Sequence, residues 1–189
     1  MIKNLIVGIA SIFLSFNVFA LDDAHEYYSE RQGDMVLMLV GTGEAYEKKV
    51  PGIKEKAVCF DLDLIDMANN SVIGKGVDCL SDIQIDEDTG NINIIGTTIF
   101  KLPQGKLFTQ GPLSLRPVDI PMSTSYGMTA THITGAGREG NTIVKGTKKY
   151  ANAQANVRLS GMVDMSNFAG IGTPVKFSCI FVISEIDLN

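Results

Sequence analysis

Two carboxylates, Asp61 and Asp63, lie two residues apart in a segment where polar and apolar residues alternate. Successive side chains of a β-strand point to opposite faces, so both carboxylates share one face with Cys59. If that face lined a closed interior, confinement would favour the protonated form of at least one carboxyl, and the pair could serve as a general acid or base. If it pointed outward, they would be solvated surface charges, which is the commoner arrangement.

Three cysteines, Cys59, Cys79 and Cys179, could supply one disulfide in an oxidising compartment. The first two lie on predicted antiparallel neighbours joined by a turn near Asn69. A register centred on Asn69 places Cys79 opposite Cys59, whereas a two-residue turn that starts there places Leu80 opposite it. Cys179, on a strand near the end of the chain, is the alternative partner. Three small buried hydrophobic side chains are the alternative to any disulfide.

Histidine and tyrosine residues provide further candidates for a ligand pocket. Neither His25 nor His132 belongs to a cluster with metal-ligand spacing, so we expect no metal ion and no other cofactor. Tyr126, His132 and Tyr150 lie in or beside predicted strands and could line the mouth of a pocket. Packing in the core or at the rim is the alternative for the tyrosines, and a structural or surface role is the alternative for His132.

Strand-like alternation recurs along the chain after residue 34. Turn residues such as those at 69–71, 86–90 and 103–105 separate the segments. No amphipathic helix is evident. The predicted strands cover residues 35–40, 54–65, 72–85, 91–101, 106–109, 126–134, 144–150, 153–165 and 175–186.

The segment 111–125 contains Pro112, Pro117 and Pro121, and we expect it to be a long connection because proline cannot donate a ladder hydrogen bond. A meander of about eight strands must protect its edges, and closure into a barrel does so. We therefore expect an all-β protein that forms a single eight-stranded antiparallel barrel, with room for packed side chains or one small ligand. A two-sheet β-sandwich is the alternative.

The N-terminal segment has the features of a signal peptide. Lys3 precedes an apolar stretch, and Val18-Phe19-Ala20 fits the small-x-small rule for cleavage. We expect a signal peptide at 1–20 with cleavage near Ala20, a flexible arm at 21–34 and the barrel domain at 35–189. A retained anchor is the less favoured alternative because the stretch is short for a bilayer span. The mature protein is thus expected to be secreted or periplasmic, without a membrane span.

The most specific local pattern is the segment 145–155, KGTKKYANAQA. It resembles the Gly-Gly-Thr-Gly-Lys-Tyr-x-x-Ala-Arg-Gly segment of dirigent proteins and allene oxide cyclases, and the order of parts over residues 55–186 is similar. The chain resembles a distant, bacterial-type member of that superfamily. The resemblance implies an eight-stranded barrel with an internal pocket in which reactive hydrophobic molecules are steered or cyclised.

The chain departs from this pattern at several positions. The arginine of the motif is Gln154, the glycine after it is Ala155, and the glycine before the Lys-Tyr pair is Lys148. An arginine can hold an anionic or phenolic oxygen with a charged fork, which glutamine cannot do. Gln154 therefore remains a pocket candidate without that charge, and Arg158 is the residue that could supply it.

The formal net charge of −5 and the lack of a basic patch argue against nucleic acids and anionic membrane surfaces as partners. We expect a secreted or periplasmic barrel that binds a small hydrophobic ligand or a protein partner without catalysis. Loops such as 111–125 and 135–141 could carry contacts with a protein. The alternative is an isomerase or cyclase acting on an unsaturated lipid or phenol, with Asp61 or Asp63 as its acid-base group. The sequence leaves the oligomeric state open.

Overall fold

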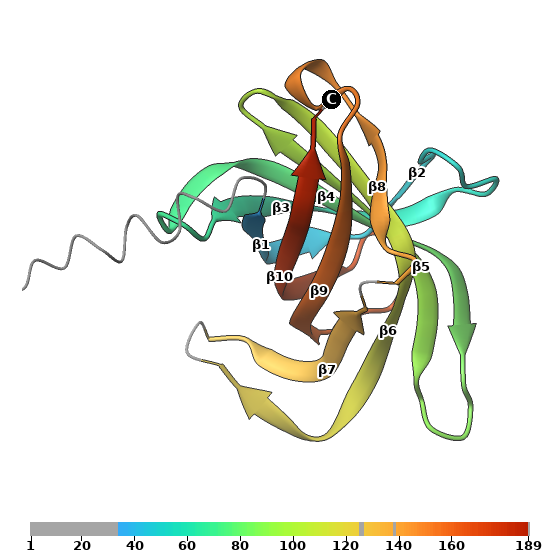
Figure 1. The fold of residues 1–189 in the computed structure, drawn as a ribbon. Helices are drawn as coiled ribbons and strands as arrows, with labels where there is room; N and C mark the ends of the chain where they lie inside the picture. Colours follow the sequence, from blue (N-terminus) through green and yellow to red (C-terminus); the bar gives the residue numbers. More distant parts are fainter. Residues whose placement is uncertain (1–33, 125–126, 138, 189) are drawn as a thin grey trace, which may run out of the picture. The chain divides into compact units, whose positions relative to one another are not determined.

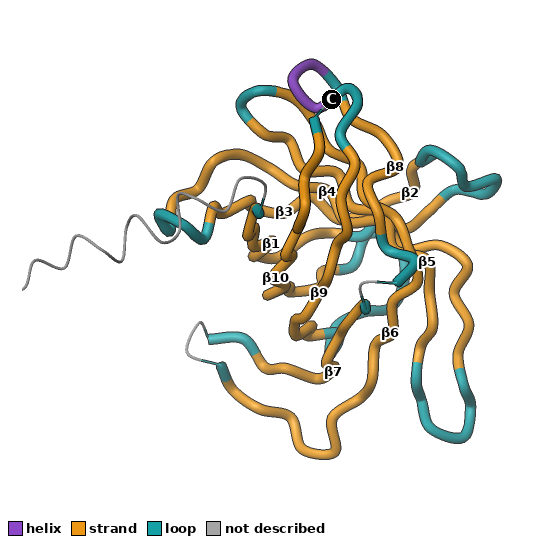
Figure 2. The backbone as a smooth tube through the Cα atoms, viewed as in Figure 1, coloured by secondary structure: helices purple, strands orange, loops and turns teal. Residues whose placement is uncertain are grey.

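The computed structural model describes residues 34–124, 127–137 and 139–188. The expected signal peptide, nearly all of the expected arm and Tyr126 lie outside these residues. The described chain is built of strands, with one short 3₁₀ helix at Lys148–Tyr150 (Figure 2). The strands are β1 (Met35–Glu44), β2 (Tyr46–Lys48), β3 (Ala57–Asp66), β4 (Ser71–Ile85), β5 (Ile92–Leu102), β6 (Gly105–Ser123), β7 (Thr129–Ala136), β8 (Thr142–Gly146), β9 (Gln154–Asp164) and β10 (Pro174–Asp187).

Eight strands close into an antiparallel barrel in the order β1-β10-β9-β7-β6-β5-β4-β3 (Figure 1). The circle closes where β3 pairs with β1, from Leu37 opposite Asp66 to Val40 opposite Asp63. Strands β2 and β8 are additional to this circle: β2 pairs with β3, and β8 pairs with β6 and β9. The predicted barrel is thus confirmed, and the sandwich alternative is wrong.

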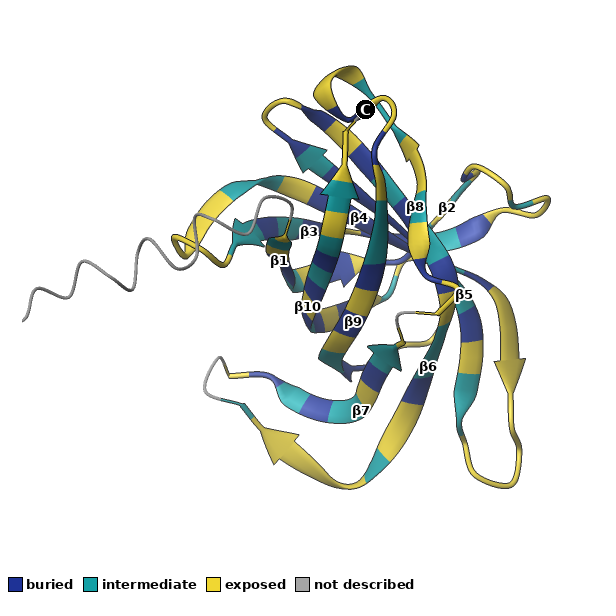
Figure 3. Ribbon diagram, in the orientation of Figure 1, coloured by how far each residue is buried: buried dark blue, intermediate teal, exposed yellow. Residues whose placement is uncertain are grey.

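Alternation along the strands separates a packed interior from the outer face. On β10, buried residues alternate with more exposed ones over Val175–Ile183 (Figure 3). Aromatic rings from non-adjacent strands meet inside the barrel, with centroids 4.9 Å apart for Phe60 and Phe177 and 5.1 Å apart for Phe100 and Phe181. This apolar interior is the main core of the molecule.

A second, smaller core lies on the outer side of the barrel wall. The connection between β2 and β3 contributes Val50, which packs with Val77, Ile99 and the two cysteines of the wall. Gln110 ties this connection to the wall, because its side-chain amide donates hydrogen bonds to the Pro51 carbonyl and the Thr97 hydroxyl. The disulfide is therefore shielded from solvent although it lies outside the barrel interior.

A disulfide joins Cys59 and Cys79, which are directly opposite on β3 and β4. The turn alone would not bring them together. Asp66 pairs with Ser71 across a four-residue loop, a register that would place Asp78 opposite Cys59. An extra residue in β4, Ile73, shifts the pairing by one between Leu64 and Ile65. The bulge, and not a turn centred on Asn69, sets the register, and Cys179 is a free, buried thiol.

The expected connection at 111–125 is wrong, because β6 runs as a strand to Ser123. Its prolines lie where a ladder donor is not required. Pro112 pairs with β5 on one side, and on the other side it falls between the stretches of β6 that pair with β8 and with β7. Pro121 lies in the irregular stretch between Pro117 and Met122, beyond the end of the pairing with β5.

The segment that carries the family resemblance forms β8, the 3₁₀ helix and the start of β9. Tyr150 is buried in the main core at the end of the 3₁₀ helix. A side chain at Gly146 would collide with the backbone carbonyl of Tyr150, so the close approach requires glycine. Lys148 has a φ of 56°, the left-handed conformation that glycine adopts most readily. Lys148 therefore adopts a backbone conformation that is typical of glycine.

Candidate functional site

Asp61 and Asp63 lie on the outer face of the barrel, because Phe60 and the leucines of β3 occupy the inner face. Both side chains are about half exposed and form ion pairs, Asp61 with Lys101 at 3.4 Å and Asp63 with Lys75. Asp61 also accepts a hydrogen bond from Tyr46, whose pKa burial and the Asp61 charge raise to about 12. The two carboxylates are therefore surface charges and do not face a common interior.

The other residues singled out from the sequence do not converge on one cavity. His132 is half-buried, its Nδ1 lies 2.9 Å from the Thr131 hydroxyl, and burial lowers its pKa. Tyr150 belongs to the core, where burial raises the pKa of its phenol. Gln154 and Arg158 are exposed on β9. None of these four residues lines any of the three spaces described below, and Tyr126 lies outside the described residues.

The residue that stands out chemically is Asp78, a carboxyl on the inner face of β4. It is 8% exposed, lies opposite Phe60 on one side and Thr98 on the other, and accepts a 2.7 Å hydrogen bond from the Thr98 hydroxyl. Burial raises its pKa to about 6, and the Thr98 hydrogen bond offsets only part of that effect. Such a carboxyl gains and loses its proton close to neutral pH.

Cys179 lies on the opposite side of the interior, on β10, and lines the same small cavity as Asp78. Burial raises the pKa of its thiol, and the nearby Asp78 charge raises it further. The group is therefore a neutral thiol at physiological pH. This environment is the opposite of the electropositive one that activates a nucleophilic cysteine.

The barrel interior contains two small cavities, each with about 20 Å³ of space for water-sized spheres. One lies between Asp78 and Cys179, and the other lies beside Thr98, Thr109 and Asn141. A space of this size holds about one water molecule. Binding sites for drug-sized molecules are typically 300–1,000 Å³, so no such molecule fits in the interior as it stands.

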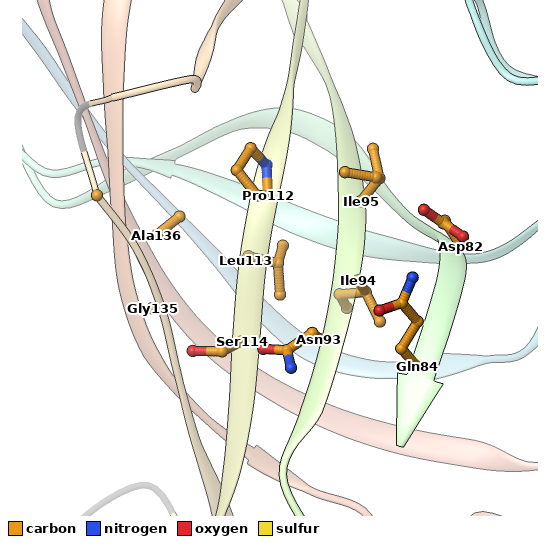
Figure 4. A pocket seen from close by; sticks show the side chains of 11 residues that line it. Asp82, Gln84, Asn93, Ile94, Ile95, Pro112, Leu113, Ser114, Gly135 and Ala136 are labelled. Atoms are coloured by element: carbon orange, nitrogen blue, oxygen red, sulfur yellow. The ribbon is translucent and has the colours of Figure 1, made fainter. Parts of the chain in front are cut away.

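A much larger space, of about 490 Å³, is an open groove across β4, β5, β6 and β7 (Figure 4). It lies where the β4–β5 and β6–β7 hairpins leave the body of the barrel, both of which extend downward in Figure 1. Its walls combine apolar side chains with hydrogen-bonding groups. The lining residues are Asp82, Gln84, Asn93, Ile94, Ile95, Pro112, Leu113, Ser114, Gly135, Ala136 and Gly137.

Local features of the strands create this groove. Between Ser81 and Gln84 the pairing of β4 with β5 shifts, and Asp82 adopts a φ of 50° at this irregularity. Across the groove, Gly135 of β7 has no side chain to fill the space beside Ser114, its partner on β6. The groove is thus built from irregular and glycine-containing ends of strands, which the alternation pattern does not reveal.

Sequence reasoning missed Asp78, although a usable signal was present. Directly opposite residues point to the same side of a sheet, so a Cys59–Cys79 pair places Asp78 on the face opposite Cys79. That is the face of Phe60, the apolar side of β3. The inference requires the disulfide register, which depended on a bulge that the turn residues did not indicate.

No three His, Cys, Asp or Glu side chains come together as a metal site in residues 34–124, 127–137 and 139–188. In the same residues, no helix has the length and apolar character needed to cross a bilayer. The described residues that line the groove and the two cavities offer apolar surface, amides, hydroxyls, two carboxyls and the Cys179 thiol. No protein-family model and no curated protein sequence matches the chain.

Proposed function

We propose that the protein is a secreted or periplasmic barrel that binds a small, partly apolar ligand in the groove across β4–β7, without catalysis. The observation that carries the proposal is the contrast between the groove, at about 490 Å³, and the interior cavities of about 20 Å³. The groove has the size of typical ligand sites, and the interior does not.

The composition of the groove supports a ligand with both apolar and hydrogen-bonding parts. Ile94, Ile95 and Leu113 offer apolar surface, and Gln84 and Asn93 offer amide donors and acceptors. A few polar groups placed on an apolar wall are typical of sites that fix the orientation of a small molecule. The same groups also fit an apolar side chain of a protein partner, which is the second kind of ligand to test.

The disulfide and the N-terminal segment support the proposed location. A buried disulfide is typical of proteins that fold in an oxidising compartment. The resemblance of residues 145–155 to the dirigent and allene oxide cyclase motif supports a ligand-binding barrel. Because glutamine stands at position 154, where the motif has arginine, we do not propose cyclase activity for this protein.

The proposal is tested by blocking the groove. The mature protein is incubated with an extract of lipids and phenols and analysed by native mass spectrometry. We expect a bound mass with the wild type, and loss of that mass in Ser114→Trp, which fills the groove. Thr42→Trp is the matched control, because Thr42 is exposed on β1 and lines none of the three spaces. An equal bound mass in both variants, or none with the wild type, would rule out the groove.

Asp78 favours a second candidate function, the isomerisation of an unsaturated lipid or phenol. A carboxyl that titrates near pH 6 could take a proton from one carbon of a substrate and return one to another. In D₂O such a reaction introduces deuterium into the product. Mass spectrometry of the extract after incubation would then show a deuterium shift with the wild type and none with Asp78→Asn. No shift with either protein would exclude this function.

A further inference from the structure

Leu113 borders each of the three spaces described above: the groove, the cavity at Asp78 and the cavity at Thr98. It lies on β6 opposite Ile94 and is only half-buried. In Figure 4 its side chain lies in the middle of the groove, between β5 and β6. Leu113 thus lies between the open groove and both interior cavities, and Ala136 also borders the groove and the cavity at Thr98.

The neighbouring strand leaves room for this side chain. A Cβ at Gly96 would overlap the Cδ2 atom of Leu113, so the side chain occupies a slot that exists because residue 96 is glycine. Gly96 itself lines the cavity at Thr98. The atom nearest to that Cβ is the Cδ2 methyl at the flexible end of Leu113, which moves when the side chain changes rotamer. A ligand that displaces this side chain gains access to the interior.

The two interior cavities are close neighbours. Both are bordered by Leu113 and Leu159, and the hydrogen-bonded pair Asp78 and Thr98 contributes one residue to each. Displacement of Leu113 would therefore connect the groove with both cavities and bring Asp78 within reach of a ligand.

The charges that the described residues place along this route have one sign. The groove contributes Asp82, the interior contributes Asp78, and none of the described residues that line the three spaces is lysine, arginine or histidine. A buried carboxylate without a cationic partner is costly, and a ligand cation that pairs with it removes much of that cost. The cavity at Asp78 is otherwise lined mainly by apolar side chains, so the cation must be carried on an apolar body.

We infer that the groove and the two cavities form one branched site divided by Leu113, and that its ligand is an apolar molecule bearing a protonated amine that pairs with Asp78. This inference rests on the proposed function, because the ligand enters through the groove. It adds the ligand class and the residue that controls the depth of binding.

The first test uses three probes with one skeleton: 2-phenylethylamine, 2-phenylethanol and phenylacetate. Binding at pH 7.5 is measured by titration calorimetry for the wild type, Leu113→Ala and Leu107→Ala. Leu107 is the matched control because it faces inward on the same strand but lines none of the three spaces. We expect Leu113→Ala to bind the amine at least tenfold more tightly than Leu107→Ala does. The affinity of Leu113→Ala for the three probes should decrease in the order amine, alcohol, acid. If Leu113→Ala does not fold, Leu113→Val replaces it in the same titrations.

The role of Asp78 is tested in the same background. In Leu113→Ala with Asp78→Asn, the preference for the amine over the alcohol should disappear. If the amine binds the wild type and Leu113→Ala equally, and Asp78→Asn has no effect, the inference is overturned while the groove function stands. If no probe binds any variant and Ser114→Trp changes no bound mass, both this inference and the proposed groove function are overturned.

Access to the interior has an independent readout in Cys179, the free thiol that lines the cavity at Asp78. Modification by methyl methanethiosulfonate is followed by mass spectrometry of the whole protein. We expect Leu113→Ala to react at least tenfold faster than the wild type, and Leu107→Ala to react at nearly the wild-type rate. Equal acceleration in both variants would mean that truncation loosens the barrel in general, and would contradict a gate at Leu113.

Discussion

The hydroxyl of Thr98 donates a 2.7 Å hydrogen bond to Asp78 between neighbouring strands, inside a barrel whose interior is otherwise mainly apolar. The bond satisfies one acceptor of the carboxyl but supplies no positive charge. Asp78 is consequently a cost to folding whenever it is ionised, and carboxyls with perturbed pKa values cluster at functional sites. Asp78 is therefore a candidate for a role in binding or catalysis.

The first prediction concerns pH. The pKa of Asp78 rises from 3.8 to about 6 on folding, so the folded state holds the proton more tightly than the unfolded state. The free energy of unfolding should therefore fall as pH rises from about 4 to about 6. Above about pH 6 the loss of stability that ionised Asp78 causes should stay constant. The difference between the two pKa values corresponds to a loss of at most about 3 kcal/mol in the free energy of unfolding.

This prediction is measured by urea denaturation between pH 4 and 8 for the wild type and Asp78→Asn. The difference between the two proteins isolates Asp78, because the lowered pKa of His132 affects both alike. Cys179, the thiol near Asp78, stays protonated over this range since its pKa is raised. We expect Asp78→Asn to gain stability relative to the wild type as pH rises through 6. A difference that does not change with pH would show that Asp78 is not a buried titrating group.

The second prediction concerns the disulfide between Cys59 and Cys79. The bond closes a loop with a sequence separation of 20 residues, which corresponds to about 3 kcal/mol of loop-closure entropy in the unfolded chain. The double variant Cys59→Ala with Cys79→Ala should lose about that much stability in urea. Reductant should destabilise the wild type and leave the double variant unchanged, and destabilisation of both by reductant would contradict the assignment.

The third prediction concerns Lys148, whose φ of 56° is unfavourable for a residue with a Cβ. Lys148→Gly should stabilise the protein by about 1 kcal/mol, measured by thermal or urea denaturation. Lys149→Gly is the control: it lies in the same 3₁₀ helix, does not have a positive φ, and should be destabilising. Loss of stability in both variants would contradict the strained turn.

The fourth prediction concerns the outer carboxylates. Asp63→Asn removes an exposed ion pair with Lys75 and should change the free energy of unfolding by less than about 1 kcal/mol. It should also leave probe binding and the bound mass unchanged, since Asp63 lines none of the three spaces. A large loss of binding in this variant would contradict the groove and would indicate a binding site on the outer face of β3.

Much of the barrel was predictable because alternation reports directly which side chains face water. The alternation of Phe60 and the leucines of β3 with polar residues indicated a strand with one apolar face, and the tight turn after Leu102 indicated the β5–β6 hairpin. Which face of β3 points inward was left open by the sequence. The course of β6 was not predictable, because prolines at 112, 117 and 121 normally end a strand. They are tolerated here where the pairing on one side of the strand is interrupted or ended.

The candidate site was less predictable than the fold. The sequence drew attention to Asp61 and Asp63, which share a face, whereas a single carboxyl such as Asp78 carries no pattern of its own. Its position follows only from the bulge at Ile73, which sets the register of β4. The groove depends on strands far apart in the sequence and on missing side chains, such as that of Gly135, so no local motif indicates it.

The measurement that tests the central claim most directly is an amide NMR titration of the wild-type protein with 2-phenylethylamine at pH 7.5. Shifts should be largest at groove residues such as Asn93, Ser114 and Gly135, and should extend to Thr98 in the interior. Absence of shifts, or shifts centred on the outer faces of β1 and β3, would contradict a ligand site that begins at the groove and ends at Asp78.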